Sequence, residues 1–395
     1  LPAGREPGAP YDLIPMYRRV ATAFKQQLTV AANFVEVFLA REGHQGPVGI
    51  NYLAKIQMPT LPSLYGAMLA GVDYVLMGAG IPRDIPGVLD RFSSGLPAGL
   101  RLDVGGSSST DVVELEFDPA TCGLQSPSDL KRPAFLPIVA SNSLVTVMAR
   151  KANGRVDGFV IEGPTAGGHN APPRGRKSFN DRGEPVYGPR DEVNLDRVAD
   201  EGLPFWVAGG MGRPDQVERA LSSGASGVQV ATLFAYCQES GLSEAIKDSV
   251  VQRCQSESVD VRTDDRASPT GFPFKAVDIP ESVSSPDIYD ARERICDLGY
   301  LRTAVQNVDG RLAYRCPAEP VASFVAAGGA VEETVGRRCL CNSLLANIGL
   351  AQLREDGSSE PTFVTSGDDL AHLGTFLDGR TSYSAAEVID YLLPN

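Results

Sequence analysis

His169 is the residue of this sequence best placed to do chemistry. It follows the apolar run 159–161 through a turn that contains Gly167 and Gly168. A barrel strand delivers its last side chains to the face where ligands bind, and paired glycines let the backbone approach a planar ligand closely. We therefore expect His169 to act at that face. A histidine that only caps its loop by hydrogen bonds is the alternative.

Two glycine-rich turns further along the chain could bind a phosphate group. The first follows the apolar run 205–208, and the second follows the run 227–230. In many barrels the loops after strands seven and eight hold phosphate through backbone N–H groups and a helix dipole. Glycines that serve only for tight turns are the alternative. The residues predicted to form this cradle are Ala208, Gly209, Gly210, Met211, Gly212, Gln229, Ala231 and Thr232.

Four of the seven cysteines fall within a short part of the C-terminal region, at Cys296, Cys316, Cys339 and Cys341. Four thiolates could bind Zn²⁺ tetrahedrally or hold an iron–sulfur cluster. Their spacing matches no standard ligand pattern. Buried, inert cysteines are therefore the interpretation we prefer, with a metal site at these four residues as the alternative.

The elements that position these residues alternate in type between residues 28 and 240. Short apolar or β-branched runs followed by helical patterns are typical of βαβ units and a parallel sheet. This predicts an α/β fold, a closed (β/α)8 barrel whose first strand lies upstream of Leu1, with an open doubly wound sheet as the alternative. The strands are expected at 28–33, 48–52, 74–77, 135–139, 158–161, 205–208 and 227–230, and the helices at 61–70, 85–92, 143–151, 192–200 and 215–223.

Two insertions and a long extension depart from this alternation. Residues 97–119 alternate in the manner of a hairpin, and residues 170–190 are rich in Pro, Gly and Arg. Long loops at the carboxyl ends of barrel strands are commonly lids or specificity elements. We expect a barrel domain over 1–240 and a cysteine-containing extension of mixed helix and loop over 241–395.

Composition restricts the partners and the compartment. The net charge of −13 opposes binding to nucleic acid, because phosphate backbones reward clusters of Lys and Arg. The chain has no apolar run of membrane-spanning length, and residues 1–5 do not have the pattern of a signal peptide. We expect a cytoplasmic enzyme that acts on a small-molecule or carrier-bound substrate and binds neither nucleic acid nor membranes, with a homodimer as one option.

These motifs together resemble the nitronate monooxygenase family, formerly called 2-nitropropane dioxygenases, which includes FMN-dependent enoyl-acyl-carrier-protein reductases. The matching stretches are 78–82, 166–169, 208–211 and 227–232. The resemblance implies a TIM barrel, non-covalent FMN, and His169 as the catalytic acid or base. Besides the cradle, the residues predicted to bind FMN are Asn51, Gly78, Ala79, Glu162, Gly167 and Gly168.

The resemblance implies two enzymatic hypotheses. In the first, an alkyl nitronate or a similar carbon acid is oxidised with FMN and O₂, and His169 removes the α-proton or holds the anion. In the second, a carrier-bound or CoA-bound enoyl thioester is reduced, with NAD(P)H as the reductant. The basic residues of the loop 170–190 would then meet the carrier or its phosphopantetheine. A catalytically silent flavin-binding subunit is a third hypothesis.

Overall fold

The protein is built around one curled parallel sheet of six strands. The computed structural model describes residues 9–106, 112–124, 127, 129–307 and 309–393. The strand order is β1-β2-β6-β7-β9-β10, so each strand pairs with the next one of the sheet along the chain. The bounds are β1 Gly49–Leu53, β2 Tyr74–Gly78, β6 Ala134–Val139, β7 Phe159–Glu162, β9 Phe205–Ala208 and β10 Gly227–Gln229.

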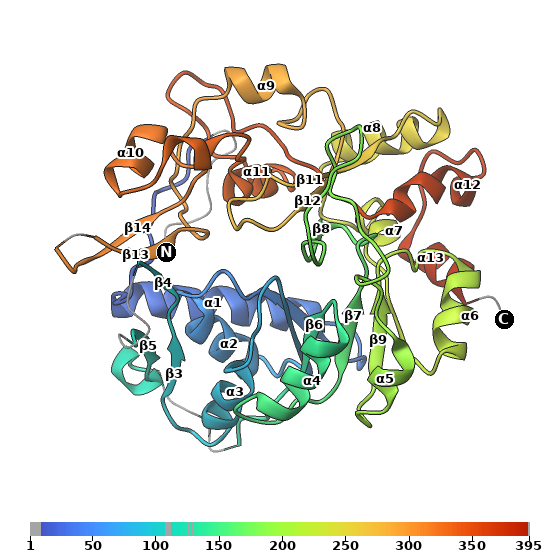
Figure 1. The fold of residues 1–395 in the computed structure, drawn as a ribbon. Coiled ribbons are helices and arrows are strands. Elements are labelled where there is room, and N and C mark those ends of the chain that lie inside the picture. The colour runs from blue at the N-terminus through green and yellow to red at the C-terminus, as the bar shows by residue number, and fades with distance from the viewer. Residues whose placement is uncertain (1–8, 107–111, 125–126, 128, 308, 394–395) are drawn as a thin grey trace.

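Helices connect these strands and cover the outer face of the sheet (Figure 1). Each connection must run back along the sheet because parallel strands need a crossover, which a helix supplies. The helices are α2 Thr60–Leu69, α3 Ile85–Ser93, α4 Asn142–Lys151, α5 Leu195–Ala199 and α6 Pro214–Ser222. The predicted α/β barrel class is confirmed. Among the described residues, the sheet has six of the eight strands of a closed barrel.

One predicted strand is wrong. Residues 28–33 lie inside α1, Ala23–Ala40, a helix that buries Val30 and Val37 against the core. These two side chains are seven residues apart, the spacing of one helical face, whereas the β-branched run around them suggested a strand. Thr22 caps the helix by accepting a hydrogen bond from the Lys25 backbone. The other six predicted strands are confirmed to within a residue or two.

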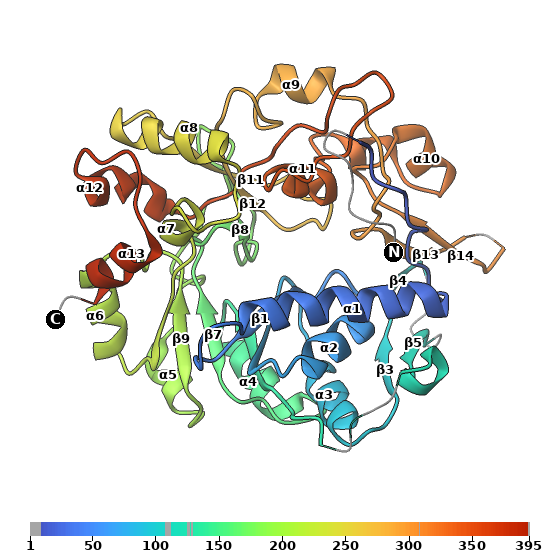
Figure 2. The same ribbon diagram turned by 180° about the vertical axis from the view of Figure 1, so that it is seen from behind.

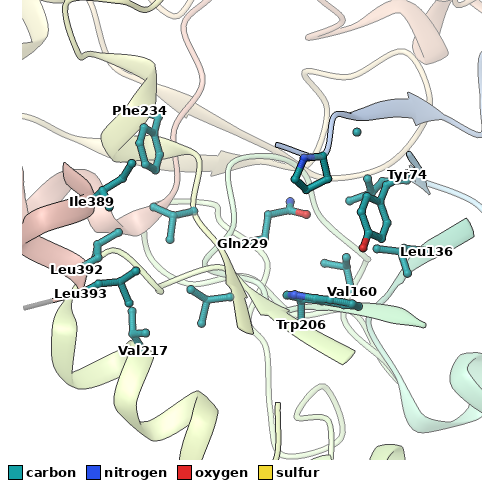
Figure 3. Close-up of a pocket in the computed structure, with 15 residues that line it drawn as sticks. Tyr74, Leu136, Val160, Trp206, Val217, Gln229, Phe234, Ile389, Leu392 and Leu393 are labelled. Atoms are coloured by element: carbon teal, nitrogen blue, oxygen red, sulfur yellow. The ribbon is translucent and has the colours of Figure 1, made fainter. Parts of the chain in front are cut away.

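The concave face of the sheet encloses an apolar cavity of about 600 Å³ (Figure 3). Side chains from five of the six strands line it, Tyr74 and Trp206 among them, and β1 contributes Gly49. Ile389 and Leu392 of the helix α13 (Ala385–Leu392) lie on one side. None of the residues predicted to be catalytic lines this cavity, although Gln229 of the predicted phosphate cradle does.

The insertion at 97–119 contains the hairpin that the sequence predicts. Strand β3, Ala98–Arg101, pairs antiparallel with β5, Glu114–Phe117, and the 3-10 turn η1, Pro119–Cys122, follows. The short strand β4, Val104–Gly105, leaves this hairpin and joins a sheet formed by the C-terminal region. The loop 170–190 contains no named helix or strand, and one isolated bridge, between Phe179 and Pro185, holds its two halves together.

The C-terminal region contains strands as well as the helices and loops that the sequence predicts. The strands are β11 Val261–Asp264, β12 Phe274–Val277, β13 Thr303–Gln306 and β14 Leu312–Arg315. The helices are α7 Thr232–Ala235, α8 Glu244–Gln255, α9 Pro286–Ala291, α10 Val321–Ala326, α11 Leu340–Ala346 and α12 Leu373–Leu377, with 3-10 turns η2 Val331–Thr334 and η3 Asp368–His372.

Two small sheets connect the C-terminal region to the part of the chain that forms the main sheet. Strand β8, Gly168–His169, pairs with β12, and β4 pairs with β13. Figure 1 and Figure 2 both place β8 between the six-stranded sheet and the C-terminal elements. Among the described residues, none of the helices combines the length and apolar character that a bilayer crossing requires.

Candidate active site

Three loops converge where the strands β7, β9 and β10 end. A Cβ atom built on Gly209 would lie 2.8 Å from the Ala166 nitrogen, so the loops after β7 and β9 touch through bare backbone. The C-terminal region links the loop after β10 to them: the Gly367 nitrogen donates to the Thr232 hydroxyl at 3.0 Å, and the next residue, Asp368, donates its nitrogen to the Thr165 carbonyl at 2.9 Å. The structure therefore brings the predicted histidine loop and both predicted phosphate turns to one end of the sheet.

His169 is held in place by a strand of the C-terminal region. In the β8–β12 pairing it lies opposite Phe274, whose ring meets the imidazole edge to face at 5.0 Å. The neighbouring Gly168 nitrogen donates to the Thr365 hydroxyl at 2.7 Å, and that hydroxyl bonds in turn to the Lys275 carbonyl. Sequences more than a hundred residues apart thus fix the backbone on which His169 stands.

A chain of hydroxyl groups leads to the imidazole of His169. Nε2 lies 2.6 Å from the Ser268 hydroxyl, which lies 2.8 Å from the Thr270 hydroxyl, and the Phe272 nitrogen donates to the latter at 3.3 Å. If Thr270 donates to Ser268 and Ser268 donates to Nε2, both hydroxyl protons are used within the chain. We assign this arrangement, which leaves the proton of the neutral imidazole on Nδ1.

Burial keeps the His169 ring neutral. Removal from water disfavours the charged imidazolium and lowers the pKa of His169 to about 4. The surroundings are aromatic: besides Phe274, the ring of Phe272 lies 6.4 Å away, edge to face. The Lys55 ammonium lies 5.9 Å from the centre of the Phe272 ring. At neutral pH His169 can therefore accept a proton.

Glu162 ends β7 with its carboxyl group in a small, mostly apolar recess. Tyr187, Arg174 and Asp191 from the loop 170–190 line this recess, which has a volume of about 20 Å³. Desolvation raises the pKa of Glu162 to about 7. The carboxyl group can thus carry a proton near neutral pH, beside the turn that leads to His169.

The turn predicted to bind phosphate contains two left-handed glycines, and one of its amides is already engaged by a carboxylate. Gly209 and Gly210 have φ values of 87° and 72°, a left-handed conformation that suits glycine and exposes successive N–H groups. The Gly212 nitrogen donates to the Asp369 carboxylate at 2.9 Å, directly before α6. An anionic oxygen thus occupies this turn in the way a phosphate oxygen would.

The other residues predicted to bind FMN lie at the same end of the sheet but in different surroundings. Asn51 is exposed on β1, and Ala79 follows β2 with a φ of 51°, a strained value for a residue with a Cβ. Gly78 ends β2, where its backbone carbonyl accepts from the Ala54 nitrogen at 2.8 Å. At Gly167 a Cβ would lie 2.8 Å from the Gly367 nitrogen, so this glycine packs against the C-terminal region.

The four C-terminal cysteines receive no geometric support as a metal site. Within the ranges described, no group of three or more His, Cys, Asp or Glu side chains is arranged to hold a metal ion. Burial is the main influence on these thiols: it raises the pKa of Cys296 and of Cys341 to about 12 and that of Cys316 well above its usual value. Thiols in such surroundings are protonated and inert.

The site also contains residues that the sequence did not single out for it. Ser268 and Thr365 bond to the histidine strand, and Asp369 bonds to the phosphate turn. All three lie in the region after residue 241. They are so far along the chain from the residues they contact that the spacing in the sequence does not indicate the contact. The turn Ser268-Pro269-Thr270-Gly271 is the one local sign of ordered structure there.

The fold is an α/β barrel, and its match to a family of flavin-dependent oxidoreductases gives the class. Residues 94–266 match the family described as nitronate monooxygenase, which confirms the resemblance seen in the motifs. The matched stretch contains the hairpin insertion, His169, both phosphate turns and the loop 170–190.

Solved structures share the overall arrangement at low sequence identity. FabK from Thermotoga maritima is 16% identical, with 92% of this chain and 86% of that chain covered and a TM-score of 0.47. The enoyl reductase domain of MlnA, from the macrolactin biosynthesis cluster of Bacillus amyloliquefaciens, is 11% identical, with 94% and 84% covered and a TM-score of 0.47. At these scores neither likeness bears on the substrate. No curated protein matches in sequence.

Proposed function

We propose that this protein oxidises an alkyl nitronate, or a related carbon acid, with FMN as the cofactor and O₂ as the oxidant. The observation that carries the proposal is the neutral His169 imidazole at the carboxyl end of the sheet. A general base must be unprotonated at the working pH, and the pKa of about 4 meets that condition. With a neutral carbon acid, such as the nitroalkane from which a nitronate derives, the lone pair of Nε2 takes the α-proton in place of the hydrogen bond from Ser268, whereas the nitronate itself has already lost that proton.

The residues that would hold FMN follow from the converging loops. Gly209 and Gly210 offer bare N–H groups for the phosphate, and the start of α6 adds its dipole. Because the Asp369 carboxylate bonds to Gly212, a phosphate must displace this carboxylate or bind beside it. The flavin ring would be held by Gly78 and Ala79 at the end of β2, Glu162 at the end of β7, Gly168 of β8 and Asn51 in the middle of β1. When bound, FMN supplies the acceptor for the electrons of the substrate carbon.

The loop 170–190 favours this proposal over reduction of an enoyl thioester. An acidic carrier or a phosphopantetheine needs available cations, but three basic side chains of the loop are engaged within the protein. Lys177 pairs with Asp265 at 2.5 Å, and Arg182 pairs with Asp260 at 2.7 Å. The Arg174 guanidinium donates to the Ala140 carbonyl at 2.7 Å. These contacts hold the loop against the rest of the protein. They leave fewer of its cationic side chains available to bind a carrier.

The test compares the two substrates on the flavin-loaded protein. Purified protein is incubated with FMN, and oxygen uptake is measured with an alkyl nitronate. In parallel, the flavin is reduced anaerobically with NADH or NADPH, and an enoyl thioester is offered. We expect oxygen uptake with the nitronate and slow reduction by either nucleotide. Rapid nucleotide oxidation with turnover of the thioester alone would overturn the proposal, and so would a failure to bind FMN.

His169→Ala tests the base directly. The variant should keep its yellow flavin absorbance and lose about 10²- to 10⁴-fold in turnover of the neutral nitroalkane, from which a proton must be removed. The matched control is His44→Ala, at an exposed turn near the start of β1. Equal rates for His169→Ala and the wild type would remove His169 from the mechanism.

A further inference from the structure

Three successive residues of the C-terminal region, 367–369, contact the three loops that converge at the predicted phosphate cradle. Each residue contacts a different loop, and the third contact places a charged oxygen on a turn amide. The hydrogen bonds are Gly367 N to the Thr232 hydroxyl after β10 at 3.0 Å, Asp368 N to the Thr165 carbonyl after β7 at 2.9 Å, and Gly212 N after β9 to the Asp369 carboxylate at 2.9 Å.

The Asp369 carboxylate stands where a bound anion would stand. A Cβ atom built on Gly212 would lie 2.9 Å from Oδ2 of Asp369, so the carboxylate packs directly on the backbone of the turn. The turn leads into α6, whose N-cap residue Arg213 makes no side-chain hydrogen bond to the first turn of the helix. Backbone N–H groups at the start of a helix attract anions. A carboxylate of the chain itself therefore fills the anion position of this turn.

The charges around Asp369 indicate that the carboxylate and a phosphate do not bind there together. Arg213 and His372, in contact with each other at 3.2 Å, favour the charged carboxylate, but Arg213 is shared with Asp215 at 3.4 Å. Removal from water has the larger effect and raises the pKa of Asp369 above its ordinary value. One negative charge is already costly here. A phosphate dianion beside it would bring three negative charges to one turn, so the two groups compete.

The carboxylate can leave the turn without a rearrangement of the backbone. Leu370 and Leu373, the residues that follow in η3 and α12, are fully buried and fix this part of the chain. The Asp369 side chain itself is only partly buried. Rotation about its χ1 angle to another staggered position moves the carboxylate away from Gly212 and towards water.

We propose that Asp369 determines which flavins this protein binds. Its carboxylate competes with the FMN phosphate for the turn after β9 and weakens the binding of FMN relative to a flavin that has no phosphate. FMN binds when the carboxylate has turned away from Gly212, whereas riboflavin binds with this hydrogen bond intact. The inference rests on the proposed flavin site and adds to it a specificity determinant from the C-terminal region.

Titration of the full chain with FMN and with riboflavin tests the proposal, with the change in flavin fluorescence as the readout. Asp369→Ala should increase the preference for FMN over riboflavin about tenfold, because the phosphate gains the hydrogen bond that the carboxylate held. The affinity for riboflavin should stay at the wild-type value, which also shows that the variant is folded. Asp369→Asn keeps an oxygen acceptor for Gly212 and removes only the charge, so it should give a smaller gain. Asp390→Asn, exposed on α13, is the charge-matched control and should leave the preference unchanged.

Inorganic phosphate tests the same turn without a flavin. Phosphate should raise the temperature of thermal unfolding of Asp369→Ala more than that of the wild type, with chloride at equal ionic strength as the control for screening. An unchanged or reduced preference for FMN in both Asp369 variants, or an equal response of Asp369→Ala and wild type to phosphate, would overturn the proposal. If no flavin binds to any of these proteins, the proposed function fails, and the phosphate series still decides the role of Asp369.

Discussion

At the scale of single residues, Glu162 links the active site to stability. Its folded pKa of about 7 lies above the usual 4.5, so the folded protein holds this proton more tightly than the unfolded chain does. The stabilising contribution is complete below pH 4.5 and is lost as the pH rises through 7. The loss amounts to at most about 3 kcal/mol, from 1.36 kcal/mol for each pKa unit.

Glu162→Gln should remove this pH dependence. Relative to the wild type, the variant should gain unfolding free energy between pH 5 and pH 8, because the amide never has to ionise in its recess. Urea unfolding at the two pH values measures the gain. Glu218→Gln, on the exposed face of α6, is the control and should show no such gain. A difference between Glu162→Gln and wild type that stays constant with pH would contradict the assignment.

Ser268 is a positioning residue for His169. If its hydroxyl donates to Nε2, it stabilises the neutral imidazole, so its removal should raise the pKa of His169. Ser268→Ala should therefore move the acid limb of the pH–rate profile to higher pH and lower the turnover about tenfold, with FMN retained. Thr270→Val, one hydroxyl further along the chain, should have the same effect to a smaller degree. An unchanged acid limb in Ser268→Ala would show that the hydroxyl does not set the protonation of His169.

At the scale of elements, the packing of α1 on α2 depends on one glycine. A Cβ atom added to Gly66 would lie 2.2 Å from the Val30 carbonyl oxygen. Gly66→Ala should gain about 1 kcal/mol in helix propensity, but the forced separation of two backbones should cost more, for a net loss of about 1 to 3 kcal/mol. Thermal or urea unfolding measures it. Gly188→Ala, which has open space around it, should change stability little. Unaltered stability in Gly66→Ala would mean that α1 does not pack this closely.

The local sequence pattern was sufficient to predict the strands of the curled sheet, but it was insufficient to predict the elements of the rest of the chain. Strands such as β7 and β9 are apolar on both faces and end in glycine turns, a signal contained in ten residues. The run 28–33 misled because its β-branched residues outweighed the helical spacing of Val30 and Val37. The C-terminal strands β12 and β13 are short, and their partners β8 and β4 lie about a hundred or more residues away, so no local signal marked them.

The same distinction holds for the candidate site. His169 and the glycine turns were predicted because each follows its own strand directly. Ser268, Thr365 and Asp369 reach the site through the fold of the C-terminal region, which the pairing of β8 with β12 and the contacts of residues 365–368 bring to the histidine. Long-range pairing of this kind depends on the tertiary structure, which residue spacing does not encode.

At the scale of the whole molecule, the C-terminal region closes the active-site end of the sheet. It pairs with β8, contributes hydroxyl groups to His169 and places a carboxylate at the start of α6. The buried Lys275 ammonium on β12 pairs with Asp368 at 2.7 Å, which ties two parts of the region together beneath the site. The concave side of the sheet is built differently, because its apolar side chains line a cavity next to a small buried cluster of Leu136, Val160 and Ala208.

The apolar cavity on the concave face should bind a hydrophobic dye in the native state. Trp206, the single tryptophan of the chain, lies along its wall beside Val160 (Figure 3). We expect 1-anilinonaphthalene-8-sulfonate to fluoresce on binding and to quench Trp206 by energy transfer, with the near-ultraviolet circular dichroism unchanged. That last condition separates a native cavity from a molten state. Val230→Phe narrows the cavity at the end of β10 and should reduce both the dye fluorescence and the quenching of Trp206. Equal quenching in this variant, or no dye fluorescence with the wild type, would show that the cavity is closed in solution.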